Sequence, residues 1–227
     1  MNKLVVGNWK QNKTLKETKE WITIFDALIS KYIEDKGTAG LAVDIIVAPP
    51  FPFLPAFQDI RTRISNFYVA SQDVSAFESG RHTGEVGTFQ LKDFVEYSLV
   101  GHSERAEGRD LVMQKVDRLL EAAITPVMCF SEFKPELYKE GVVLVWEDPE
   151  NISNEGGDRA KSIEEVAEGI KKLRVALPAK AKVLYGGSVN RQNAPLLSNI
   201  DGLDGVLPGN ASLDPTYFFE IIKAFDK

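Results

Sequence analysis

The sequence is poor in the residue types that build covalent cross-links and metal sites. Its 227 residues include a single cysteine, Cys129, so no disulfide can form within the chain. Cys129 lies in the apolar run 127–130, which predicts a buried structural thiol rather than a nucleophile. The two histidines, His82 and His102, lie far apart and lack the spacing of metal ligands. We therefore expect no metal site.

Three further absences narrow the class of protein. No apolar run is long enough to span a bilayer, and the start of the chain shows no signal region, so we expect a cytoplasmic protein. No Gly-x-Gly-x-x-Gly or Gly-Lys-Ser/Thr loop follows the first apolar run, so we expect no dinucleotide, ATP or other cofactor. The net charge is −6 without a basic patch, which argues against nucleic acid or an anionic membrane as partner. An anionic substrate would therefore need a local cation.

Short apolar runs alternate with amphipathic stretches along the chain. The apolar runs predict strands at 4–8, 43–48, 67–71, 99–101, 127–130, 142–146, 183–185 and 204–207. The amphipathic stretches predict helices around 21–32, 53–64, 88–97, 111–123, 163–173 and 190–198, and a last helix capped by Asp214. Only a short helical turn fits in 134–140. Eight such units without a linker predict one α/β domain, 1–227, folded as a closed (β/α)8 barrel with a shortened fifth helix. An open doubly wound sheet is the alternative.

Polar side chains follow three of the predicted strands at the end where barrel enzymes place their chemistry. Because strand side chains alternate, Asn8 and Lys10 continue the core-facing row of the first strand, and Glu147 continues that of the sixth. His102 and Glu104 follow the fourth strand. Each alone could be a solvated loop residue, but different functional groups on one rim favour a site.

Glycine-rich segments follow the last two strands. Gly187 and Ser188 come after the seventh strand, and Gly209 and Asn210 come after the eighth. Glycine lets a backbone approach a ligand closely, and exposed N–H groups there can bind a phosphate. These two loops form the usual phosphate site of barrel enzymes, although either one alone could be a tight turn.

Together these segments resemble the signature segments of the triosephosphate isomerase family, in the family's order and over the whole chain. The matching segments are Gly7-Asn8-Trp9-Lys10, Ala48-Pro49-Pro50-Phe51-Pro52, Thr83-Gly84-Glu85, Gly101-His102-Ser103-Glu104-Arg105, Tyr185-Gly186-Gly187-Ser188-Val189, Asp204-Gly205-Val206-Leu207 and Ala211-Ser212-Leu213. The resemblance implies a TIM barrel that interconverts dihydroxyacetone phosphate and glyceraldehyde 3-phosphate through an enediolate.

The resemblance also implies a role for each rim residue. Glu147 matches the family's base, His102 its electrophile and Lys10 its electrostatic stabiliser, while Asn8 and Glu104 match their polar neighbours. A glutamate base paired with a neutral histidine is the known arrangement of this family. Phosphate contacts through backbone N–H groups are implied for Gly187, Ser188, Gly209 and Asn210. Lys10 would supply the local cation that an acidic chain needs.

The chain departs from the family pattern directly after the base. Segment 148–157 carries added acids where the family has a glycine-hinged lid, which puts the tightness of closure in doubt; Ser153 is its candidate phosphate contact. Asn210 replaces a glycine, a change expected to be mild because Asn tolerates positive φ. The shortened fifth helix is similar to that of archaeal members, which tend to associate beyond dimers.

The polar loop 72–87 resembles the family's dimer loop. Gln72 opens it, and Thr83 and Glu85 lie near its end. A polar loop of this length is unusual inside a compact domain. We therefore expect self-association as a homodimer or a tetramer, and the resemblance implies that Thr83 supports Asn8 and Lys10 of the neighbouring subunit.

Two other functions remain open at this point. One is a barrel that binds a phosphorylated sugar without converting it, although mere binding needs no base at Glu147. The other is a different phosphate-barrel isomerase or lyase, which would be expected to lack Gly-His-Ser-Glu-Arg after the fourth strand.

Overall fold

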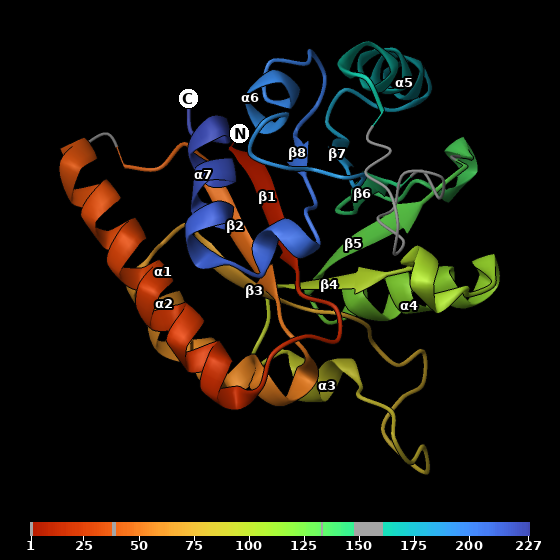
Figure 1. Cartoon of the computed structure of the whole chain (residues 1–227). Helices are drawn as coiled ribbons and strands as arrows, with labels where there is room; N and C mark the ends of the chain where they lie inside the picture. Colours follow the sequence, from red (N-terminus) through yellow and green to blue (C-terminus); the bar gives the residue numbers. More distant parts are fainter. Residues whose placement is uncertain (1, 38–39, 133, 148–160) are drawn as a thin grey trace.

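The computed structural model describes residues 2–37, 40–132, 134–147 and 161–227. Eight parallel strands form a closed barrel in sequence order, with helices around its outside (Figure 1). The strands are β1 Lys3–Asn8, β2 Val43–Ala48, β3 Phe67–Ser71, β4 Tyr97–Val100, β5 Thr125–Phe130, β6 Val143–Trp146, β7 Lys182–Tyr185 and β8 Gly205–Val206. The pairing of β1 with β8 closes the barrel. This confirms the predicted barrel and excludes the alternative of an open doubly wound sheet.

Seven α-helices lie in the described part of the chain, and three of them begin after a residue whose side chain accepts an N–H group of the first turn. They are α1 Leu15–Lys36, α2 Gln58–Arg63, α3 Thr88–Leu91, α4 Arg109–Glu121, α5 Ile163–Ala176, α6 Ala194–Leu197 and α7 Pro215–Phe225. Thr14 and Glu17 form a capping box on α1, and Ser162 and Glu165 form one on α5. The predicted cap of the last helix is confirmed, because Asp214 Oδ1 accepts the N–H of Tyr217 at 2.7 Å. None of the described helices combines the length and apolar character needed to cross a membrane.

Two apolar layers lie on the two faces of the sheet. The inner layer fills the barrel and includes Leu4, Val6, Cys129, Val143 and Val145. The outer layer packs the sheet against the helices and contains most of the large buried side chains. On β6 the inward Val143 and Val145 alternate with the outward Leu144, so the residue after Trp146 returns to the inward face, as predicted for Glu147.

The connection between β5 and β6 is much reduced. Its described part holds one 3-10 helix, Pro135–Leu137, which confirms the short turn predicted there. Leu144 on the outside of β6 is nevertheless fully buried, and Leu137 and Tyr138 pack against the outer core to which it belongs. Side chains of a short turn thus replace part of the cover that a full helix would give.

The predicted helix at 88–97 is wrong beyond Leu91. There the chain leaves α3 and enters β4 at Tyr97, which pairs with Ala70 on one side and Thr125 on the other. The N–H of Glu96 already donates to Val69 O at 3.1 Å. Sheet hydrogen bonds therefore override the helical spacing of the apolar residues in this segment.

Two other predicted helices start later than expected. In the predicted helix 53–64, Pro55 lies inside a 3-10 helix, Phe51–Phe57, and the α-helix begins only at Gln58. Proline lacks the N–H that an α-helical turn requires. In the predicted helix 190–198, Asn190 Oδ1 accepts the N–H groups of Gln192 and Asn193, each at 2.9 Å. Residues 190–193 form this turn instead of a helix, so α6 begins only at Ala194.

Candidate active site

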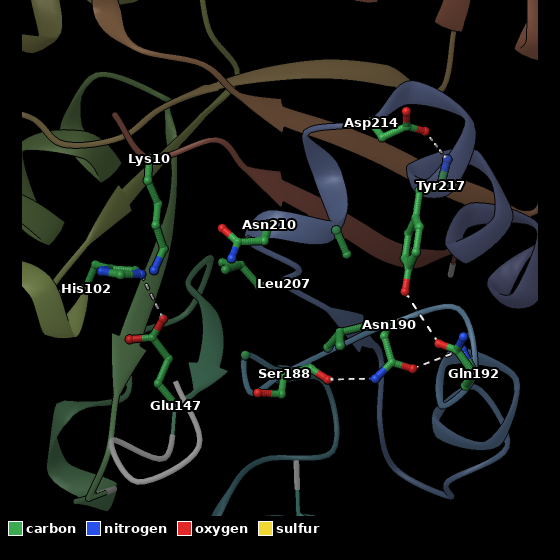
Figure 2. Close-up of a pocket in the computed structure, with 14 residues that line it drawn as sticks. Lys10, His102, Glu147, Ser188, Asn190, Gln192, Leu207, Asn210, Asp214 and Tyr217 are labelled. Atoms are coloured by element: carbon green, nitrogen blue, oxygen red, sulfur yellow. Dashed lines mark hydrogen bonds and ion pairs between the residues drawn. The ribbon is translucent and has the colours of Figure 1, made fainter. Parts of the chain in front are cut away.

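A cavity of about 490 Å³ opens at the carboxyl ends of the strands (Figure 2). The predicted site residues among those that line it are Lys10, His102, Glu147, Ser188, Gly209 and Asn210. They come from the segments after β1, β4, β6, β7 and β8. The fold therefore brings most of the predicted rim residues to one cavity.

Glu147 is fixed between two neighbouring segments. Its backbone N–H donates to Phe130 O at 2.8 Å, which extends the pairing of β6 with β5 by one residue. The residue is only 2% exposed. One carboxylate oxygen, Oε2, accepts the N–H of Ser103 at 3.2 Å, and the other, Oε1, lies 3.2 Å from His102 Nε2. A buried carboxylate with a defined aim is what a base for a carbon acid requires.

The ring of His102 is oriented by a backbone N–H group of the turn that follows it. The N–H of Glu104, in the 3-10 helix Ser103–Arg105, donates to His102 Nδ1 at 3.2 Å. Because Nδ1 uses its lone pair to accept that bond, the ring proton lies on Nε2. Nε2 points toward the Glu147 carboxylate on the same side of the cavity (Figure 2). The imidazole can therefore give a hydrogen bond to an oxygen bound beside the carboxylate.

Cys129 lies beside the carboxylate and stays protonated. The side chain is fully buried, as predicted, and burial raises the pKa of its thiol well above the usual range. The negative charge of Glu147 and a hydrogen bond to it act in the same direction. Sequence reasoning missed this contact. The alternation that placed Cys129 inside the barrel, combined with its register opposite Val145, could have found it.

Lys10 is positioned by three polar contacts. It has a positive φ of 52°, and its N–H donates to Oδ1 of the buried Asn8 at 3.1 Å. Its ammonium Nζ lies 2.5 Å from Glu104 Oε1. Gln72 Nε2 donates to Lys10 O at 2.9 Å and to Ala48 O at 2.8 Å. The first residue of the predicted dimer loop therefore braces the Lys10 loop of its own chain, a role the sequence did not suggest.

The two glycine-rich loops lie next to this cation. A Cβ atom at Gly209 would lie 3.5 Å from Lys10 Cε, so loop and side chain are neighbours. Ser188 has a positive φ of 31° and lines the cavity. Asn210 begins a 3-10 helix and is not among the described residues with positive φ, so its tolerance of positive φ is not needed there. Gly187 packs against Tyr185 instead and is not among the lining residues.

Four further polar side chains line the cavity and were not predicted. Figure 2 shows Asn190, Gln192 and Tyr217 on the side opposite Glu147. The hydroxyl of Tyr217 donates to Gln192 Oε1 at 3.4 Å, and Asp214 lies at the same edge while it caps α7. No sequence signal distinguished these residues from ordinary turn residues.

The remaining predicted residues lie elsewhere. Ser153 and the proposed lid 148–157 are outside the described residues. Thr83 and Glu85 are exposed on the loop between β3 and α3, which extends away from the barrel (Figure 1). Neither lines the cavity of its own chain. In the described ranges, no group of three or more His, Cys, Asp and Glu side chains is arranged to hold a metal.

The fold and the cavity together define a class of protein. A closed barrel presents a carboxylate, an imidazole and an ammonium around one cavity, beside two backbone loops of the kind that bind phosphate. This is a barrel enzyme equipped to move a proton on a small anionic substrate.

Comparison with known proteins gives the family. The family model for triosephosphate isomerase matches residues 3–148 and 135–225. The triosephosphate isomerase of Mesomycoplasma hyorhinis is 32% identical, with 96% of this chain and 97% of the relative covered. The enzyme of Thermus thermophilus is 31% identical with 97% of each covered, and that of Aquifex aeolicus is 29% identical with 99% and 100% covered. The chain belongs to the triosephosphate isomerase family.

Proposed function

We propose that Glu147, His102 and Lys10 carry the triosephosphate isomerase activity of this chain, the interconversion of dihydroxyacetone phosphate and D-glyceraldehyde 3-phosphate. One observation supports this most strongly. The buried carboxylate of Glu147 and the Nε2 donor of His102 lie 3.2 Å apart at one cavity, which Lys10 also lines.

The reaction needs one base and a set of donors. Glu147 removes a proton from the carbon next to the substrate carbonyl, and the electron pair of that C–H bond forms the enediolate double bond. The carbonyl oxygen becomes negative and accepts a hydrogen bond from His102 Nε2, while the ammonium of Lys10 stabilises the charge. Return of the proton to the neighbouring carbon, together with transfer of the hydroxyl proton to the former carbonyl oxygen, completes the isomerisation without a redox partner. Asn8 and Glu104 support this site by orienting the backbone and the ammonium of Lys10.

The substrate phosphate would be bound by the loops after β7 and β8. The backbone of Gly187, Ser188, Gly209 and Asn210 supplies the proposed contacts, with Ser153 as a further one from outside the described residues. Support comes from the place of Ser188, Gly209 and Asn210 on the cavity and from the closeness of Gly209 to Lys10. The acidic chain thus holds its anionic substrate beside a local cation.

We also propose that the chain acts in the cytoplasm as one domain, 1–227, in a homodimer or tetramer. The loop 72–87 is internally bonded, with Ser75 N–H donating to Val86 O at 2.8 Å, yet its outer part is exposed. Such a loop is suited to contact a second copy, where Thr83 would support Asn8 and Lys10 of the neighbour. Thr83→Arg should yield monomers with poor activity by light scattering and assay. Fully active monomers would contradict the proposal.

A coupled assay of the wild type beside Glu147→Gln tests the base directly. We expect fast conversion of glyceraldehyde 3-phosphate by the wild type and a collapse of turnover in the variant, because an amide cannot take the proton. Glu168→Gln, the same change on the exposed surface of α5, is the matched control and should behave as wild type.

An inhibitor separates catalysis from simple binding. Phosphoglycolate mimics the planar enediolate, so an isomerase should bind it more tightly than substrate, and Glu147→Gln should weaken that preference. Equal affinity for mimic and substrate, with no turnover in a folded wild type, would favour a binding protein instead.

A further inference from the structure

The indole of Trp146 occupies a notch in helix α5. The notch exists because residue 169, inside that helix, is glycine. A Cβ atom at Gly169 would lie 2.2 Å from Cη2 and 2.3 Å from Cζ3 of the Trp146 ring. Real side-chain contacts of that length do not occur. The two residues are therefore complementary, because the large ring of Trp146 fits only where residue 169 has no side chain.

Trp146 is the residue directly before Glu147. Its backbone is fixed on both sides, since it pairs with Phe130 of β5 and with Tyr185 of β7, and its carbonyl accepts the N–H of Gly186 at 2.9 Å. The ring projects to the outside of the barrel while Glu147 projects inward. The contact with Gly169 therefore sets how far the end of β6 stands from the helix behind it.

Two other contacts hold the same ring. Its centroid lies 5.8 Å from that of Tyr185, and the ammonium of Lys161 lies 5.9 Å from it. The Trp146 ring thus contacts β7 and the segment that leads into α5, in addition to α5 itself. A ring confined by several elements cannot move aside alone, so a displacement passes to its own backbone.

We propose that Gly169 and Trp146 form a positioning pair for the base of the reaction: the helical notch at Gly169 sets the depth of the Trp146 ring and thereby the position of the Glu147 carboxylate. The inference depends on the proposed role of Glu147. It adds Gly169, on the far side of the sheet, to the residues that determine turnover.

The expected effect follows from the distances. An ordinary contact needs roughly 3.4 Å or more, so a methyl group at position 169 would push the ring by about 1 Å. A misplacement of about 1 Å at a reacting group can cost on the order of 10²-fold in rate. The three heavy atoms nearest to the added methyl group all belong to the Trp146 ring, so substrate binding should change little.

The test compares Gly169→Ala with the double variant Gly169→Ala/Trp146→Phe. Gly169→Ala should lower kcat by roughly 10- to 100-fold with KM within about twofold of wild type. The smaller phenyl ring of the double variant leaves room for the methyl group, so kcat should recover most of the loss. Gly108→Ala is the matched control, because a Cβ there meets nothing within 4 Å, and it should leave kcat and KM unchanged.

Each outcome decides the proposal. Unchanged kcat in Gly169→Ala, a rise of KM as large as the fall of kcat, or failure of the double variant to recover would overturn it. If Gly169→Ala does not fold, Trp146→Phe alone should lower kcat several-fold at constant KM, because the notch is then underfilled, and a wild-type kcat would overturn the pair. The base assignment is separate: it fails if Glu147→Gln remains active, whereas an inactive Glu147→Gln beside a fully active Gly169→Ala refutes only the positioning pair.

Discussion

Shortening the proposed base by one methylene is the most informative single change in this molecule. Glu147→Asp keeps the charge and the burial but withdraws the carboxylate by roughly 1 Å or more. Its contacts to Ser103 N and to His102 Nε2 each measure 3.2 Å and would lengthen beyond hydrogen-bonding distance. The carboxylate would lose its aim and its reach toward the substrate carbon together.

The expected loss is on the order of 10²-fold in kcat, which corresponds to about 2.7 kcal/mol of barrier height. KM should change little, because the phosphate loops and Lys10 are not altered. A coupled assay that follows dihydroxyacetone phosphate formation gives both constants. Glu168→Asp, on the exposed face of α5, makes the same chemical change outside the active site and serves as the control. A kcat of Glu147→Asp within about twofold of wild type would refute the assignment of the base.

Three further predictions concern neighbouring parts of the structure. Gly186→Ala should lower kcat about tenfold or more in the same assay. The added Cβ would lie 2.8 Å from Val145 Cγ1 and 3.0 Å from Glu147 Cγ, so it would displace the base. Wild-type kinetics in this variant would show that the base tolerates the displacement. Lys10→Ala should lower kcat/KM by on the order of 10²-fold and weaken phosphoglycolate inhibition, since the local cation is lost; equal inhibition of both proteins would argue against its role. Burial raises the pKa of Tyr97 from 10.0 to about 12. The unfolded chain therefore loses the phenol proton at a lower pH than the folded protein, and the contribution of Tyr97 to the free energy of unfolding is lost as the pH rises from 10 toward 12. In urea titrations the free energy of unfolding of Tyr97→Phe should fall by roughly 1–2 kcal/mol less than that of the wild type over this range. Equal declines in the two proteins would contradict this.

The barrel could be predicted because its strands are read from local apolar runs. Most predicted strand boundaries agree with the structure within two residues, and the alternation along β6 correctly placed Glu147 on the inward face. The helix at 88–97 could not be limited to four residues in the same way. What ends it is the pairing of Tyr97 with strands on both sides, a contact between distant segments that spacing along the chain does not reveal.

The site residues also fall into those that the sequence reveals and those that it does not. Residues that chemistry marks, such as Lys10, His102 and Glu147, stand out in the sequence because ionisable groups end apolar strands. Residues that act through position do not. Gln72 looks like any loop glutamine and Gly169 like a weak helix residue until the three-dimensional contacts show a brace and a notch. Resemblance to the family identified the first kind, and only the three-dimensional structure revealed the second.

The reduced connection between β5 and β6 offers an opening for protein engineering. Gly141 turns the chain into the amino end of β6, whereas Glu147 lies just past its carboxyl end, so an insertion beside Gly141 would be remote from the reaction. The connection is tied to the rest of the barrel by ion pairs of Lys139 with Asp117 and of Glu140 with Lys180, which could anchor the chain just before a grafted segment. A peptide tag, a fluorescent reporter or a second catalytic domain could be displayed there, on a scaffold that already closes without a full helix at this position.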